Sequence, residues 1–238
     1  RAAEDCLPEI DDEELRESLV QAIKTKRDAL SIAVWNATWG TEEIERLVTL
    51  SKGFYPVDEK AGATSDLLRD LNQLNRIVRA LNNQQLDVSL EGLGAIHQRW
   101  QAEFKAGQLI NSARLLIETL NAGTKTLQGR LGERPLCLNG KPNNQSDIAQ
   151  NFFFNIYIER IQPYMSQVSR ARDDLMVGLQ QLAALQRPVM PASFQEWYQR
   201  YLSQRAEGSL WRDLDEAMAR HTRHWQQLLG QCGLRPQA

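Results

Sequence analysis

Residues 67–81 read LLRDLNQLNRIVRAL, and this stretch decides the fold class. Its apolar residues follow one another at alternating steps of four and three: Leu67, Leu71, Leu74, Val78 and Leu81. Because an α-helix has 3.6 residues per turn, this spacing places all of them on one face. Such a narrow apolar stripe is typical of a helix that packs against its neighbours at a shallow angle.

The same spacing recurs in a second stretch closer to the middle of the chain. A helix is expected from Ser89 to about residue 128, although Gly92, Gly94 and Gly107 weaken its first half. Its later part repeats the stripe at Ile110, Ala113, Ile117, Leu120 and Leu127.

A third stretch is expected to form one helix from Asp147, its N-cap, to about Gln186. Pro163 removes one backbone donor, so we expect a kink there rather than a stop. Arg172 occupies a position of the stripe at which an apolar residue is expected. Burying its charge there is destabilising unless a carboxylate or carbonyl pairs with it. The apolar positions follow the same register: Phe154, Ile158, Ile161, Met165, Val168, Leu175, Leu179 and Leu182.

Helix signals also mark the two ends of the chain. The acidic run 11–14 (DDEE) suits the N-terminus of a helix that Gly40 ends, and Thr41 caps a shorter helix after it. Near the other end, a last helix is expected to follow Gly208 and to reach about Leu229.

The sequence therefore predicts an all-α protein, an elongated up-and-down bundle of long, shallowly crossed helices with one long central loop. The Gly-, Pro- and Asn-rich residues 129–146 form that loop. We expect residues 1–238 to form a single helical domain whose two helical halves, about 9–128 and 147–230, are joined by it.

Composition and charge narrow the classes of partner. The chain carries 28 Lys and Arg against 30 Asp and Glu, a net charge of −2, so nucleic acid is an unfavourable partner. No apolar run approaches the roughly 20 residues that span a bilayer. The chain begins at Arg1 rather than Met, which leaves room for a signal or lipid anchor before it. The bias toward Arg and Gln over Lys favours a bacterial origin.

Three cysteines, Cys6, Cys137 and Cys232, are the disulfide candidates. No two stand in a Cys-x-x-Cys spacing, which argues against zinc and thioredoxin-like redox chemistry. Cys6 is expected before the first helix, and none of the three is expected on a packed apolar helix face. One disulfide plus a leftover thiol in an oxidising, extracytoplasmic compartment is slightly favoured over three thiols in a reducing cytosol.

The sequence contains no recognisable catalytic motif. It lacks a Gly-x-Ser-x-Gly elbow, a His-Glu-x-x-His helix and a phosphate-binding loop. His221 and His224 stand three residues apart and share a metal only if a third ligand such as Asp215 joins them; packed or partly exposed imidazoles are the favoured interpretation. We expect no cofactor and no metal.

Two aromatic groups and one cation are the candidate binding residues. Phe152, Phe153 and Tyr157 belong to a turn whose apolar residues cover most of the helix circumference, so it is either buried on all sides or offers an apolar face to a ligand. Core packing is the alternative for this group and for the second one. The remaining candidates lie further along the chain: Arg172, a possible anion anchor, and Trp197, Tyr198 and Tyr201 on a short helix.

These features favour a non-catalytic helical interaction protein of the bacterial cell envelope, the soluble part of a periplasmic or lipid-anchored factor whose partner is another protein. Two alternatives stay open: a small-molecule sensor or carrier with an aromatic-lined pocket, and a cytosolic adaptor or toxin-neutralising (immunity) partner. An enzyme whose site is assembled from distant residues would be invisible at motif level.

Overall fold

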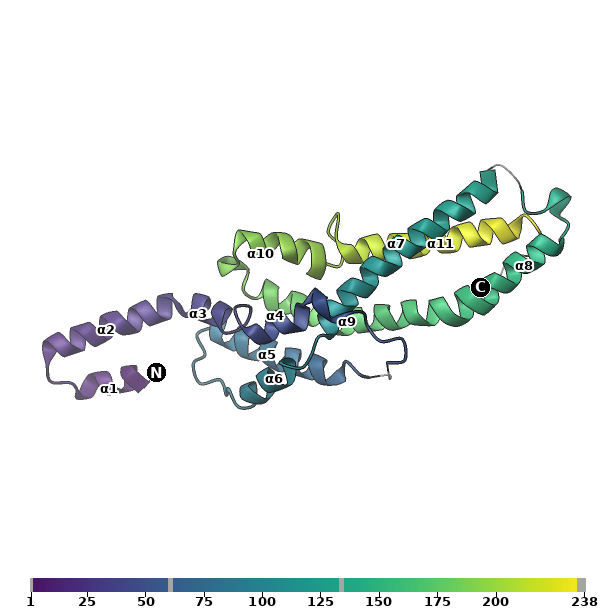
Figure 1. Cartoon of the computed structure of the whole chain (residues 1–238). Helices are drawn as coiled ribbons and strands as arrows, with labels where there is room; N and C mark the ends of the chain where they lie inside the picture. The colour runs from purple at the N-terminus through teal and green to yellow at the C-terminus, as the bar shows by residue number, and fades with distance from the viewer. Residues whose placement is uncertain (1, 60–61, 133–134, 235–238) are drawn as a thin grey trace.

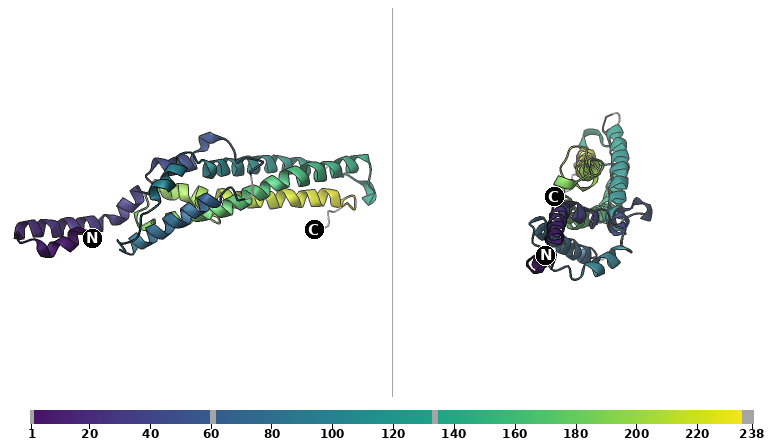
Figure 2. Two further views of the ribbon diagram at one scale, coloured as in Figure 1. Left: turned by 90° about the horizontal axis from the view of Figure 1, so that it is seen from below. Right: turned by 90° about the vertical axis from the view of Figure 1, so that its left-hand side faces the viewer.

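The computed structural model describes residues 2–59, 62–132 and 135–234, and every regular element in these ranges is helical. Arg1 and residues 133–134 of the expected central loop lie outside them. The prediction of an all-α helical bundle is confirmed. Figures 1 and 2 show an elongated molecule in which long helices run side by side and an N-terminal arm extends from one end. In chain order the α-helices are α1 Ala2–Cys6, α2 Glu13–Asp28, α3 Leu30–Asn36, α4 Glu42–Val48, α5 Ser65–Asn82, α6 Leu93–Trp100, α7 Lys105–Gly132, α8 Asn144–Phe152, α9 Gln162–Ala184, α10 Ala192–Trp197 and α11 Leu210–Gly230.

Shorter helical segments connect or extend these helices. Two of them are π-helical: η4 continues α8 into α9, and η6 continues α10. The other four are single 3₁₀ turns. The segments are η1 Leu7–Glu9, η2 Leu50–Lys52, η3 Leu138–Gly140, η4 Phe153–Ile161, η5 Arg187–Val189 and η6 Tyr198–Leu202.

The main helix pairs join the two halves of the sequence. The stripe on α5 packs against α9, and α7 packs along α11 and also meets α9. Leu71 and Leu179 are both fully buried in this core. At the end opposite the N-terminal arm, α7, the continuous helix α8–η4–α9 and α11 form a three-helix bundle (Figure 1).

The expected first long helix is in fact two helices. The chain bends at Ala29, between α2 and α3, and α2 buries none of its residues. Among other elements, α2 makes its main contacts only with α1, η1 and α3, so it forms the arm seen in Figure 1. Its stripe of apolar residues predicted a helix correctly, but the amphipathic pattern could not say whether a neighbour covers it. Cys6, expected before the first helix, ends α1.

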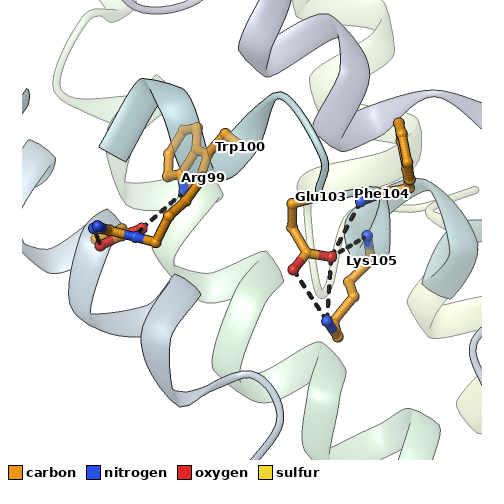
Figure 3. Close-up of polar contacts among 6 residues, drawn as sticks. Arg99, Trp100, Glu103, Phe104 and Lys105 are labelled. Atoms are coloured by element: carbon orange, nitrogen blue, oxygen red, sulfur yellow. Dashed lines mark hydrogen bonds and ion pairs between the residues drawn. The ribbon is translucent and has the colours of Figure 1, made fainter. Parts of the chain in front are cut away.

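The helix expected from Ser89 is also divided, into α6 and α7. Asp70 of α5 accepts hydrogen bonds from Arg99 Nε (3.0 Å) and Trp100 Nε1 (3.1 Å), which hold α6 against α5 (Figure 3). Glu103 then accepts the backbone N–H groups of Phe104 and Lys105, at 3.1 and 3.2 Å. Because the Glu103 carboxylate satisfies these free N–H groups, a new helix starts here. The sequence pattern alone did not reveal this helix start.

The central loop is shorter than residues 129–146. Helix α7 continues to Gly132, and α8 begins at Asn144, before the expected cap Asp147. Asn143 is the actual cap: its side chain accepts from the backbone of Gln145 and Ser146, and Ser146 Oγ accepts from the Asn143 backbone at 2.8 Å. This reciprocal pair satisfies the free donors of the first turn, so the helix starts there.

A candidate apolar pocket at the end of the bundle

A large concave feature of the described residues lies in the three-helix bundle, between α7, α8–η4 and α11. We call it the end pocket. Its inner hollow, of about 350 Å³, is lined by Leu116, Thr119, Leu120, Gly123, Thr126, Leu127, Phe152, Tyr157, Ile161, His221 and Trp225. Its outer hollow, of about 690 Å³, is lined by Thr126, Leu127, Gly129, Arg130, Leu136, Gln145, Ile148, Ala149, Phe152, Trp225 and Leu228. Four residues line both hollows, so the two adjoin: Thr126, Leu127, Phe152 and Trp225.

The π-helical segment η4 supplies the aromatic wall of the pocket. Pro163 has no N–H to give, and the N–H of Gln162 bonds to Tyr157 O, five residues back. Instead of the expected kink at Pro163, the helix widens into a π-helical segment just before the proline and then continues into α9. Phe153 and Tyr157 are buried there, whereas Phe152 is half exposed at the mouth. π-Helical segments occur frequently at functional sites.

Helix α11 supplies the opposite wall through His221 and Trp225. The ring of Tyr157 lies 5.2 Å from that of His221, centroid to centroid, and 6.5 Å from that of Trp225. Its hydroxyl shares a hydrogen bond with Thr222 at 2.9 Å, and burial raises its pKa. Burial also lowers the pKa of His221. Among the described residues, the lining of the inner hollow therefore presents neutral aromatic rings and no charged side chain at neutral pH.

Helix α7 makes room for His221 with a glycine. A Cβ atom on Gly123 would lie 2.8 Å from His221 Cε1, closer than such atoms approach. A larger residue at this position would displace the imidazole. Gly123 therefore allows α7 and α11 to approach each other at the pocket.

Arg130 brings a positive charge to the mouth of the outer hollow. The guanidinium hydrogen-bonds to the side-chain oxygen of Gln145, across the mouth from α7 to α8. Ile148 lines the same hollow and is 69% exposed. The entrance therefore combines a cation with exposed apolar surface.

A disulfide closes this end of the molecule. Cys137, beyond α7, and Cys232, beyond α11, are bonded, with their Cα atoms 5.2 Å apart. Neither lies on an α-helix, yet both are buried, because the bridge itself lies against the core. Leu136, which lines the outer hollow, is bound through its N–H to Gln231 at 2.9 Å. Cys6 is an exposed thiol on the N-terminal arm.

The sequence candidates separate into three places. Phe152 and Tyr157 line the end pocket, Phe153 is buried beside it with its ring 5.3 Å from that of Trp225, and Arg172 lies elsewhere. Arg172 is bonded to Asp215 at 2.8 Å and to Asp173 at 3.0 Å, so a carboxylate does meet it on the expected apolar stripe.

Trp197, Tyr198 and Tyr201 belong to a separate aromatic cluster near the arm. Trp197 lies 5.8 Å from Tyr201 and 6.4 Å from Trp39, and Tyr198 lies within hydrogen-bond distance of Gln180 (3.5 Å). The cluster also contains Trp35 and Phe194. Sequence reasoning missed Trp35, Trp39 and Phe194, because no local pattern links α3 to α10.

The described residues contain neither a metal-ligating cluster nor a membrane-spanning helix. Within residues 2–59, 62–132 and 135–234, no group of three His, Cys, Asp or Glu side chains is placed to hold an ion. His224 Nδ1 contacts the Arg220 carbonyl at 2.8 Å, and Asp215 pairs with Arg172. Across the same ranges, no helix is both long and apolar enough to cross a membrane.

Comparison with known proteins yields one match. A family model described as "Protein of unknown function (DUF3080)" matches residues 1–236. Neither a curated protein nor a solved structure matches the chain.

Proposed function

We propose that this chain, which belongs to the DUF3080 family, is a non-catalytic binding protein that holds an apolar ligand in its end pocket. The lining of that pocket carries the proposal. Side chains from three long helices surround two adjoining hollows of about 350 and 690 Å³, the size range of small-molecule sites. Most lining residues are apolar, a few polar groups such as His221 lie among them, and the charged Arg130 stands at the mouth, as in pockets that orient a mostly apolar molecule.

Exposed apolar surface at the mouth supports the same proposal. Phe152, which lines both hollows, is 51% exposed, and Ile148, which lines the outer hollow, is 69% exposed. Soluble proteins rarely leave such side chains grouped around a cavity unless something binds there. A small-molecule carrier or sensor is therefore favoured over the other functions that the sequence left open.

The disulfide supports an extracytoplasmic location for this binding protein. A buried bridge between the ends of α7 and α11 forms and persists in oxidising compartments such as the bacterial periplasm. We infer a cell-envelope role on this basis.

The test fills the pocket and measures binding of an apolar probe. Thr126 lines both hollows, so T126W places an indole between them, and K125W adds the same ring at the adjacent exposed position. We expect the apolar fluorophore N-phenyl-1-naphthylamine to bind the unsubstituted protein and K125W, and to bind T126W at least about tenfold more weakly. Equal binding to all three proteins, or to none, would overturn the proposal.

The N-terminal arm supports a second candidate function, attachment of a protein partner. Helix α2 has no buried residue, and Leu15 and Val20 are 56% and 50% exposed. A photo-crosslinking residue at position 15 is expected to give one adduct of defined mass in cells, and the same residue at position 125 none. Adducts at both positions, or at neither, would reject this function.

A further inference from the structure

A second concave site lies between α4 and α10, away from the end pocket. We call it the α4–α10 groove. Its volume is about 430 Å³, and Trp39, Gly40, Thr41, Glu42, Ile44, Glu45, Val48, Phe194 and Trp197 line it. The end pocket and this groove share no lining residue among those described, so binding at the groove does not depend on the function proposed for the end pocket.

Three aromatic rings form one side of the groove. The centroid of Phe194 lies 4.7 Å from that of Trp39 and 5.4 Å from that of Trp197. The ring planes are inclined to one another, by 59° for Trp39 and Phe194 and by 64° for Trp39 and Trp197. All three residues also line the groove, so a ligand there meets aromatic surface that can attract a cation.

Two carboxylates also line the groove. Glu42 and Glu45 stand three residues apart on α4, which places both on one face of this helix. Both are exposed, and no hydrogen bond or ion pair within the described residues engages either carboxylate. In the described part of the chain no Lys, Arg or His lines the groove, and the neighbouring Arg46 bonds instead to the Gln101 carbonyl at 3.3 Å.

We propose that the α4–α10 groove binds a small organic cation that carries a trimethylammonium group. The methyl groups offer apolar surface to the indole and phenyl rings, and the charge is attracted by the ring faces and by both carboxylates. A quaternary ammonium has no N–H to satisfy, so contact with the rings and attraction by the two carboxylates are enough to hold it. Choline represents this class.

Isothermal titration of the full chain with choline and with its neutral isostere 3,3-dimethyl-1-butanol tests the proposal. The two molecules have the same shape and differ in charge. We expect choline to bind at least about tenfold more tightly, and its affinity to fall as salt is raised. Absence of choline binding, or equal affinity for the two molecules, would overturn the proposal.

Matched variants locate the site. E42Q/E45Q removes both charges with little change in shape and is expected to weaken choline binding about tenfold. E14Q/E17Q makes the same change at an exposed pair with the same spacing on α2 and is expected to bind choline unchanged. W197L keeps apolar bulk but removes a ring, and we expect it to lose most of the preference for choline over the isostere. An equal effect of both glutamate pairs would place the cation elsewhere and reject the groove.

Two sources of the trimethylammonium group are distinguished by sedimentation with vesicles. Binding to phosphatidylcholine vesicles that choline competes away identifies a lipid headgroup as the source. Choline binding without vesicle binding identifies a free solute. Vesicle binding that choline leaves unchanged, and that E42Q/E45Q retains, would contradict recognition of the headgroup by this groove.

Discussion

The indole Nε1 of Trp225 donates a hydrogen bond to Nε2 of His221 over 3.0 Å. Because Nε2 accepts, we assign the proton of the neutral imidazole to Nδ1, which lies 3.1 Å from the hydroxyl of Thr124. That hydroxyl in turn donates to the Leu120 carbonyl at 2.7 Å. The wall of the end pocket is therefore a satisfied polar chain inside an apolar surface, and it requires His221 to be uncharged.

The first prediction concerns pH. Burial holds the pKa of His221 below its ordinary 6.5, so between the folded pKa and about 6.5 the unfolded chain binds a proton that the folded chain does not. This contribution to the free energy of unfolding is present above about pH 6.5 and is lost as pH falls through the folded pKa. Urea denaturation from about pH 8 to pH 5 should show a shallower decline in H221Q, which cannot titrate there. Identical pH profiles would contradict the prediction.

The second prediction concerns the disulfide. Cys137 and Cys232 are 95 residues apart, and a bridge that closes a loop of this length stabilises a protein by up to about 4.7 kcal/mol in the chain-entropy model. In urea denaturation, the free energy of unfolding of C137S/C232S should therefore be about 2–5 kcal/mol lower than that of the unsubstituted chain. That of C6S should be unchanged. In protein prepared without reductant, alkylation and mass spectrometry should modify Cys6 alone. Three reactive thiols would refute the bridge.

The third prediction concerns the contact between α4 and α7. A Cβ atom on Gly107 would lie 1.9 Å from the carbonyl oxygen of Thr49, a backbone atom that cannot move without shifting the chain. We expect G107A to lower the free energy of unfolding by about 3 kcal/mol. G94A is the control, because a Cβ atom there meets nothing within 4 Å. Its stability should be unchanged or higher by up to about 1 kcal/mol. Equal stability of the two variants would show that the helices do not approach this closely.

The fourth prediction concerns Arg172, whose side chain is 14% exposed between Asp173 and Asp215. R172L removes a cation from an apolar stripe and leaves two carboxylates that are 64% and 56% exposed, so the free energy of unfolding should change by less than about 1 kcal/mol. D215N should lower the free energy of unfolding by up to about 1 kcal/mol in the natural sequence. In R172L it should have no effect, because Arg172, the partner of Asp215, is already absent. A loss of several kcal/mol in R172L, by thermal or urea denaturation, would show that the pair stabilises the fold far more than expected.

Local sequence determined which residues are helical, and it did so most securely where an apolar stripe was long. The stripes on α5, later α7, α9 and α11 depend only on residues three and four apart, so their spacing is legible without the fold. Helix ends were less predictable. Glu103 and Asn143 start helices through individual hydrogen bonds that no periodicity reports.

The site depended on contacts between distant segments. Apolar residues cover most of the circumference of the turn at 152–158, so spacing alone could not say that Tyr157 is buried while Phe152 is half exposed. The partners of Tyr157, His221 and Trp225, come from α11. The π-helical segment η4 positions the Tyr157 ring against them.

The sequence by itself determined a helical protein with three cysteines, two aromatic groups and one arginine on an apolar stripe. Only the tertiary structure decided that Cys137 pairs with Cys232, that the two aromatic groups lie at separate sites, and that α2 buries none of its residues. The physical reason is the range of the forces involved. Backbone hydrogen bonding and side-chain periodicity act within a few residues, whereas burial and pairing depend on which helices pack together across the chain.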